Sequence, residues 1–217
     1  MTTWQNAAAA VAVAGAVTLA PHRSTTVFAA GPQAETERPV ILTVGESTTA
    51  GYGVRRDLSY PSQLQKTLDE RGYRYRVVNH GVSGSTTDGA LTRLTRGMGL
   101  LPRIVIIALG GNDAGSRVPV EVTRANFARL ISMFKLAGAQ VFVADRTLPG
   151  AGTLVAELAA EHHAVLMPPL LTGVDGHPEL LLGDGRHPTA EGYTVIVARL
   201  FKIIEPYLTK DTARAAF

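Results

Sequence analysis

Five short apolar runs alternate with longer amphipathic segments after Pro39, and few folds accommodate this order. Short runs rich in Val and Ile predict strands, and repeats at helical spacing predict helices. Strands that alternate with helices are typical of a parallel sheet covered by helices on both faces. We therefore predict an α/β fold with a central, mostly parallel five-stranded sheet. The predicted strands are Val40–Val44, Tyr75–Asn79, Ile104–Leu109, Gln140–Ala144 and Ala164–Met167.

Helical spacing predicts four helices that pack on this sheet. Leu64 and Leu68 are four residues apart, and Phe127, Leu130, Ile131 and Phe134 repeat along one helical face. The last helix is expected to begin near Thr189, where a hydroxyl precedes an acidic residue. The predicted helices are Tyr60–Glu70, Val120–Leu136, Thr153–His162 and Thr189–Tyr207.

The chain divides into a leader, one domain and a tail. Its 217 residues, 46% of them hydrophobic, suffice for one core, which we place at 40–209. Within residues 1–39, the run Ala7–Ala20 is apolar. It is too short to span a bilayer but has the length of the core of a secretory leader, and a polar linker follows it. We expect export to the periplasm or medium, with the cytoplasm as the alternative. The first six residues lack Lys and Arg, so an Ala-rich extension or an uncleaved anchor is the competing interpretation. Residues 210–217 are predicted to form a flexible tail.

Charge and cysteine content exclude several classes of function. The net charge of +3 comes from scattered residues, whereas nucleic-acid binding requires a dense basic surface, so we expect no nucleic-acid partner. The chain has no cysteine, which excludes disulfides, thiolate metal sites and cysteine nucleophiles. We expect no stable membrane span in the mature domain, and the oligomeric state is left open.

Ser47 stands directly after the first predicted strand, in the sequence Gly45-Glu46-Ser47. A side chain at the carboxyl end of a parallel strand faces the crevice where open α/β sheets bind ligands. A serine nucleophile requires a histidine base held by a carboxylate. His187 follows Asp184 by three residues in a glycine-rich loop, and the other histidines (22, 80, 162, 163 and 177) lack a comparable partner. Alone, His187 would be an ordinary loop histidine before a helix.

Acyl transfer also needs donors that face the oxygen that becomes negative in the tetrahedral intermediate. Gly84 lies in a turn after the second strand, where its N–H could face the crevice. Asn112 could offer its side-chain amide from the end of the third strand, and the N–H of Ser47 would be a third donor. Taken separately, an ordinary turn glycine and an Asx turn explain the first two equally well.

Four ordered segments together resemble the SGNH (GDSL-type) hydrolases, and the resemblance runs from about Val40 to Tyr207. It is greatest for the bacterial acyl-thioesterase, lysophospholipase and arylesterase branch. The segments are Gly45-Glu46-Ser47, Val82-Ser83-Gly84, Gly110-Gly111-Asn112-Asp113 and Asp184-Gly185-Arg186-His187-Pro188. The resemblance implies a flavodoxin-like three-layer α/β/α sandwich without a metal or organic cofactor. It implies Ser47 as nucleophile, His187 as base, Asp184 as its orienting acid, and Ser47, Gly84 and Asn112 as the oxyanion hole.

The chain departs from this family at two places. Glu46 replaces an aspartate that commonly supports the nucleophile turn through local hydrogen bonds, so either the support is kept or the turn is shifted. The stretch from Leu148 to Ala164 is shorter than in the related branch, and it bears on acyl-chain preference. Candidate apolar lining residues of the pocket are Tyr52, Leu148, Pro149 and Leu180, and ordinary packing explains each of them equally well.

These features predict a serine esterase that hydrolyses small to medium acyl esters through an acyl-enzyme, with thioesters or lysophospholipids as further substrates. Deacetylation of a carbohydrate is the alternative on the same machinery, but few aromatic residues are available to stack on a sugar. The alternative of another class is a non-enzymatic flavodoxin-like binding module. Against it, the chain has neither a phosphate-binding Gly-x-x-x-x-Gly-Lys-Ser/Thr loop nor a Gly-x-Gly-x-x-Gly turn after the first strand.

Overall fold

The computed structural model describes residues 38–146, 148, 150 and 152–210. In them, five strands form one sheet in the order β2-β1-β3-β4-β5. All four pairings are parallel, and the five predicted strands are confirmed to within two residues at their ends. The strands are β1 (Val40–Gly45), β2 (Arg76–Gly81), β3 (Ile104–Ala108), β4 (Gln140–Ala144) and β5 (Val165–Met167). Most of the predicted leader and of the predicted tail lies outside the described residues.

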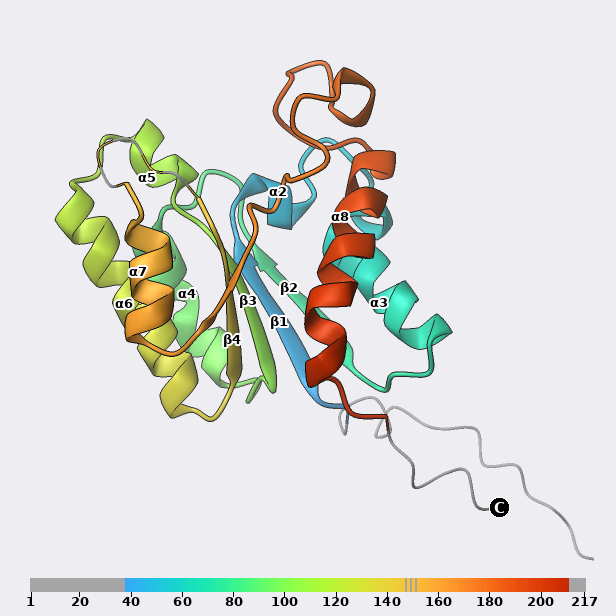
Figure 1. The fold of residues 1–217 in the computed structure, drawn as a ribbon, viewed down its shortest axis with the longest axis horizontal. Coiled ribbons are helices and arrows are strands. Elements are labelled where there is room, and N and C mark those ends of the chain that lie inside the picture. The colour runs from blue at the N-terminus through green and yellow to red at the C-terminus, as the bar shows by residue number, and fades with distance from the viewer. Residues whose placement is uncertain (1–37, 147, 149, 151, 211–217) are drawn as a thin grey trace, which may run out of the picture.

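Helices cover both faces of the sheet, which confirms the three-layer sandwich (Figure 1). One layer holds α4 (Thr87–Met98), α6 (Val120–Leu136) and α7 (Leu154–Glu161), and the other holds α3 (Tyr60–Glu70) and α8 (Ala190–Ile204). Two short helices, α2 (Ser47–Ala50) and α5 (Gly111–Gly115), come soon after β1 and β3. Single 3₁₀ turns occupy Arg56–Leu58, Pro178–Leu180 and Glu205–Tyr207.

The core divides into two halves because successive side chains of a strand point to opposite faces. In β1, Val40 and Leu42 pack toward α4, α6 and α7, whereas Ile41 packs toward α3 and α8. The helical faces predicted from spacing are buried, among them Leu64 on α3 and Phe127 on α6. Burial of each such side chain stabilises the fold by about 1.5–3 kcal/mol. The central strands are thereby held firmly enough to fix the turns at their carboxyl ends.

Helix α4 is the long element that the sequence did not predict. Its sequence contains glycines and threonines, which are poor helix formers. Two groups cap its first turn: the Thr86 hydroxyl accepts the N–H of Gly89 at 3.3 Å, and the distant Asp113 Oδ2 accepts the N–H of Thr87 at 2.9 Å. Asp113 is fully buried on α5, the short helix after β3. Of these two caps, only the contact with Asp113 leaves no local signal in the sequence.

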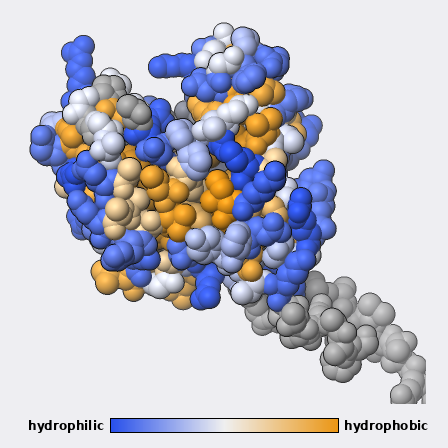
Figure 2. Space-filling model, in the orientation of Figure 1, coloured by the Kyte–Doolittle hydropathy of each residue, from blue (hydrophilic) through white to orange (hydrophobic). Residues whose placement is uncertain are grey.

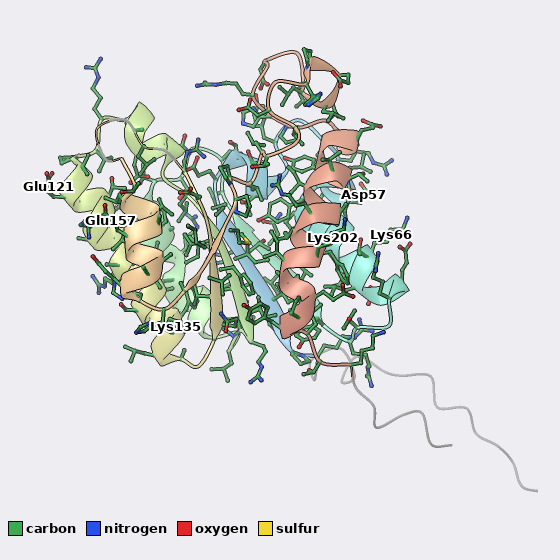
Figure 3. All side chains as sticks on the ribbon, viewed as in Figure 1. Asp57, Lys66, Glu121, Lys135, Glu157 and Lys202 are labelled. Atoms are coloured by element: carbon green, nitrogen blue, oxygen red, sulfur yellow. The ribbon has the colours of Figure 1, made fainter. Side chains whose placement is uncertain are left out.

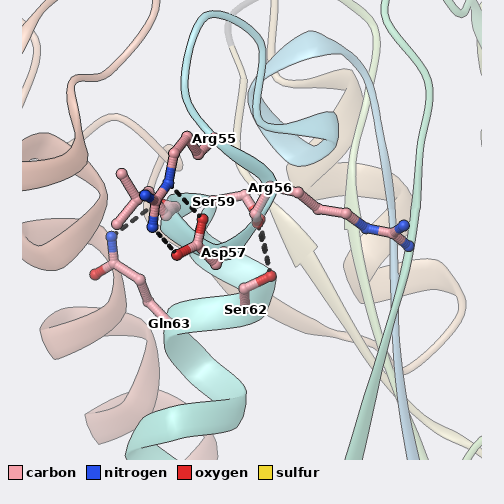
Figure 4. A network of polar contacts seen from close by, with 7 residues as sticks. Arg55, Arg56, Asp57, Ser59, Ser62 and Gln63 are labelled. Carbon is pink, nitrogen blue, oxygen red and sulfur yellow. Dashed lines mark hydrogen bonds and ion pairs between the residues drawn. The ribbon is translucent and has the colours of Figure 1, made fainter.

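The turn between α2 and α3 is fixed by a polar network (Figure 4). The hydroxyls of Ser59 and Ser62 both donate to the carbonyl of Arg56 at 2.8 Å. The Gln63 amide donates to the Leu58 carbonyl at 2.8 Å and to the Ala190 carbonyl at 3.0 Å. Gln63 therefore joins this turn to the beginning of α8, directly after the segment that carries His187.

Charged side chains of both signs lie on the outer faces of the helices, as the labelled residues in Figure 3 show. Apolar surface gathers between the helical layers in Figure 2, where the segment that includes β5 runs; Leu166 on this strand is 41% exposed. Within the described ranges, none of the helices combines the length and the apolar character needed to cross a membrane.

Candidate active site

A cavity of about 580 Å³ opens at the carboxyl edge of the sheet. Its walls come from the residues after β1, β3, β4 and β5 and from the loop before α8. Apolar side chains such as Leu109 and Leu170 form one part of the wall, and Asp145, Arg146 and Arg186 form another. Ser47 and His187 both line this cavity. The sheet therefore brings the predicted serine and histidine into one crevice.

Ser47, His187 and Asp184 form a continuous hydrogen-bonded chain. Ser47 Oγ lies 2.8 Å from His187 Nε2, and His187 Nδ1 lies 2.6 Å from Asp184 Oδ2. The backbone N–H groups of His187 and Arg186 donate to Asp184 Oδ1 at 3.0 and 2.9 Å. The backbone N–H and the ring of His187, with the N–H of Arg186, hold the pKa of Asp184 well below its usual range. Asp184 is therefore an ionised acceptor for the Nδ1 proton of His187 at any working pH.

The His187 loop is closed at its base. The Leu182 N–H donates to the His187 carbonyl at 2.7 Å, and the Thr189 N–H donates to the Leu180 carbonyl at 2.9 Å. Thr189 then caps α8, since its hydroxyl accepts the N–H of Gly192 at 3.1 Å, as the sequence predicted. The Tyr52 ring lies beside the imidazole of His187, with ring centroids 4.5 Å apart. These contacts leave the imidazole little freedom to turn away from Ser47.

Ser47 is the first residue of α2, which lies tightly against the sheet. A Cβ atom on Gly45 would lie 2.0 Å from Thr49 Oγ1 and 2.8 Å from the Ala108 carbonyl, so only glycine allows this approach. The Tyr193 hydroxyl on α8 donates to the Thr48 carbonyl at 2.9 Å. The strand-to-helix turn thus fixes the position of the Ser47 side chain, although the sequence indicated only a turn there.

The three donors predicted for the oxyanion hole belong to Ser47, Gly84 and Asn112. Asn112 Nδ2 donates one proton to the Ser85 carbonyl at 3.0 Å, and its second proton remains available because a primary amide carries two. Gly84 precedes Ser85 and has a φ of +77°. In the described part of the chain, the N–H groups of Ser47 and Gly84 have no hydrogen-bond acceptor. Asn112 and Ser47 line the cavity, and Gly84 is not among its lining residues.

Glu46 acts at longer range than the expected local support. Its side chain makes no capping hydrogen bond to α2. Instead, Oε1 accepts the N–H of Gly111 at 2.7 Å and that of Asn112 at 3.4 Å. Burial raises the pKa of Glu46, while Arg146 and these two N–H groups oppose the increase. Its hydrogen bonds are therefore not local: this carboxylate joins the nucleophile turn to the segment that carries Asn112.

Of the four candidate lining residues, the three that the structure describes lie outside the cavity. Leu148 is only 4% exposed and belongs to the core, and Leu180 packs against the other half of the core; neither lines the cavity. Tyr52 contacts His187 and is 52% exposed outside the cavity, and Pro149 lies outside the described residues.

His177 has a carboxylate partner, Glu179, at 3.3 Å, whereas the sequence predicted a partner of this kind for His187 alone.

Sequence reasoning also missed two charged residues at this edge of the sheet. Arg146 lines the cavity two residues after β4. Asp113 accepts the N–H of Thr87 at the beginning of α4. A charged pair directly after a buried strand, Asp145-Arg146, was the signal available for the first. Among the described residues, no group of three or more histidine, cysteine or carboxylate side chains is arranged to hold a metal ion.

Comparisons with known proteins point to one family. Residues 43–195 match the model of the GDSL-like lipase/acylhydrolase family. The chain is 35% identical over 161 residues to an arylesterase of Vibrio mimicus, which covers 70% of this chain and 80% of that protein. It is 30% identical over 181 residues to esterase TesA of Pseudomonas aeruginosa, and this match covers 77% of this chain and 89% of that protein.

Solved structures agree with these sequence relatives. The crystal structure of TesA matches with a TM-score of 0.71 at 30% identity and covers 77% of this chain and 98% of that one. The esterase EstA from Pseudoalteromonas sp., inhibited by monoethylphosphonate, matches with a TM-score of 0.72 at 25% identity, covering 77% and 97%. The similarity therefore extends over nearly the whole of each of these solved chains.

Proposed function

Because this chain belongs to the GDSL-like lipase/acylhydrolase family and is a carboxylic ester hydrolase, we propose that Ser47 is its nucleophile. His187 is the general base, and Asp184 orients it and stabilises its charged form. The observation that carries this assignment is the unbroken chain from Ser47 Oγ through the imidazole to Asp184. These three residues constitute a catalytic triad, of which Ser47 and His187 line the cavity and Asp184 contacts His187 Nδ1.

The reaction has two halves. In the first, His187 Nε2 takes the Ser47 hydroxyl proton while Oγ attacks the ester carbonyl, and the imidazolium then protonates the leaving alcohol. In the second, water attacks the acyl-enzyme carbonyl while His187 takes its proton; the bond between the acyl carbon and Oγ then breaks, the imidazolium returns the proton to Ser47 Oγ, and the acid is released. The negative oxygen of each tetrahedral intermediate is held by the N–H groups of Ser47 and Gly84 and by Asn112 Nδ2. The free amide proton of Asn112 beside Ser47 supports the proposal of an oxyanion hole.

The proposed substrates are neutral esters with small to medium acyl groups. A cavity of about 580 Å³ with both apolar and charged walls favours them over long saturated chains. The test is a panel of p-nitrophenyl acetate, butyrate and palmitate, acyl-CoA and acetylated xylan with purified protein. We expect kcat/KM to be highest for the acetate or butyrate. Fastest turnover of palmitate or of xylan acetyl groups would contradict this preference.

Neither alternative function is favoured. The relatives and structural neighbours are esterases, which argues against a non-enzymatic binding module. A carbohydrate deacetylase would use the same three residues, so it differs only in substrate. The xylan arm of the panel separates it from the esterase.

We expect the substitution Asp184→Asn to lower kcat by about 10³–10⁴-fold, less than the loss of the nucleophile or of the base. An asparagine amide would donate to His187 Nδ1 and force the proton onto Nε2, where it cannot accept the Ser47 proton. The two backbone N–H groups can still donate to the remaining Oδ1, so the loop should keep its shape. The measurement is kcat on p-nitrophenyl acetate with circular dichroism as the fold control. A loss below tenfold in folded protein would contradict this role of Asp184.

We also propose that the protein is exported. The apolar run Ala7–Ala20 and the small residues after it support a cleaved leader. Expression of the full chain in a bacterial host, followed by fractionation and N-terminal sequencing, tests this. Mature protein in the periplasm or medium is expected, and full-length protein confined to the cytoplasm would refute it.

A further inference from the structure

Arg146 is a charged residue of the cavity wall that the proposed mechanism does not use. It lies just after β4, and its guanidinium lies over Gly111: a Cβ atom on this glycine would be 2.4 Å from an Arg146 terminal nitrogen. The same Cβ would be 3.0 Å from Glu46 Oε2. The guanidinium and the carboxylate therefore share the space above Gly111, which only the absence of a side chain leaves open.

The two oxygens of Glu46 have different surroundings. Oε1 accepts the N–H groups of Gly111 and Asn112, and Oε2 is the oxygen on the Arg146 side of Gly111. Glu46 is only 9% exposed. A carboxylate so little hydrated needs a compensating positive charge to remain ionised. Arg146 forms no hydrogen bond or contact ion pair with another described residue, so it acts on Glu46 through its charge.

Among the charged groups that act on Glu46, Arg146 is the one that stabilises its ionised form. Burial raises the pKa of Glu46, Arg146 lowers it, and the buried carboxylate of Asp113 on α5 adds to the increase. Asp145, Asp175, Arg186 and the imidazole of His187 are the other titratable or charged groups on the cavity wall. Without Arg146, protonation of Glu46 would begin at a higher pH, and a protonated carboxyl is a weaker acceptor for the two N–H groups.

We propose that Arg146 is a positioning residue that acts through Glu46: it keeps this side chain an ionised acceptor, and the acceptor holds the backbone of Asn112. Asn112 is fixed at its backbone by Glu46 and at its amide by the Ser85 carbonyl. If the contact between Glu46 and the Asn112 N–H weakens, the side-chain amide of Asn112 tilts away from the oxyanion. This inference rests on the proposed role of Asn112 and explains what the unusual Glu46 does in this chain.

The experiment compares Arg146→Gln, Arg146→Lys and the control Arg129→Gln, each assayed on neutral p-nitrophenyl acetate. Arg129 is an exposed arginine on α6 outside the cavity, so its substitution removes the same charge elsewhere. We expect Arg146→Gln to lower kcat about tenfold with KM nearly unchanged, less than the loss of a whole oxyanion donor. The acid limb of its kcat profile should move up by about one pH unit, as expected when a nearby opposite charge is lost. Arg146→Lys should restore most of kcat and return the acid limb of the profile to its wild-type pH. Arg129→Gln should change neither quantity.

A double substitution identifies the route. In the Glu46→Gln background the carboxylate charge is gone, so Arg146→Gln should lower kcat by less than about twofold further. A full tenfold loss in that background would overturn the proposal. So would an unchanged kcat with a KM increase confined to anionic half-esters, which would make Arg146 a substrate contact. Wild-type esterase activity that depends on Ser47 tests the proposed function separately, because these arms compare only variants with one another.

Discussion

The substitution Ser47→Ala is expected to lower kcat on p-nitrophenyl acetate by about 10⁶-fold, to a rate near that of the reaction in water plus the contribution of binding and the oxyanion donors. The reason is that no other hydroxyl replaces Ser47 Oγ beside His187 Nε2. Ser47 is partly exposed on the cavity wall, so the loss of one oxygen should not unfold the protein. The assay is steady-state hydrolysis at high enzyme concentration.

Two controls make this result interpretable. Thermal unfolding of the variant should occur within a few degrees of the wild type, since a partly exposed hydroxyl contributes less than about 1 kcal/mol. Ser132→Ala is a matched serine substitution, since Ser132 Oγ also lies 3.1 Å from an imidazole nitrogen, His162 Nδ1, and Ser132 lies on α6 outside the cavity. Folded Ser47→Ala protein with more than a few per cent of wild-type kcat would remove Ser47 from the nucleophile role.

The substitution His187→Ala is expected to be nearly as severe, about 10⁵–10⁶-fold in kcat, because a serine without a base is a weak nucleophile. The double variant Ser47→Ala/His187→Ala should be no slower than either single variant, since the two residues act as one unit. Added imidazole should restore part of the activity of His187→Ala, because the vacated space adjoins the open cavity. It should not restore Ser47→Ala.

Multiplicative losses in the double variant would contradict this account, since they would mean that His187 acts independently of Ser47. His177→Ala is the matched control. His177 also has a carboxylate partner, but its imidazole is 55% exposed and lies outside the cavity. Its substitution should leave kcat unchanged.

Those parts of the fold that depend on local pattern were predictable from the sequence. Helices α3 and α6 begin and end at the residues predicted from their apolar spacing. The strands β1 and β4 were recognisable as short apolar runs, since strands covered on both faces are continuously apolar. Helix α4 was not predicted, because its glycines and threonines are poor helix formers and one of its two caps is a carboxylate brought to it by the tertiary fold.

The site shows the same division between local and long-range signals. Asp184 and His187 lie three residues apart, so their contact could be inferred from one loop. The reach of Glu46 to Gly111 spans 65 residues, and its side chain had been expected to act on its own turn. The lining of the cavity was the least predictable feature, since the burial of Leu148 depends on how the segment after β4 folds back.

The most direct test of the central claim is covalent labelling by a fluorophosphonate, followed by peptide mass mapping. A serine activated by His187 should displace fluoride and carry the phosphonyl group on Oγ, as expected for an activated nucleophile beside its base. We expect one label per chain, on the peptide that contains Ser47, and none in Ser47→Ala. Folded wild-type protein that stays unlabelled, or a label on a different residue, would contradict it.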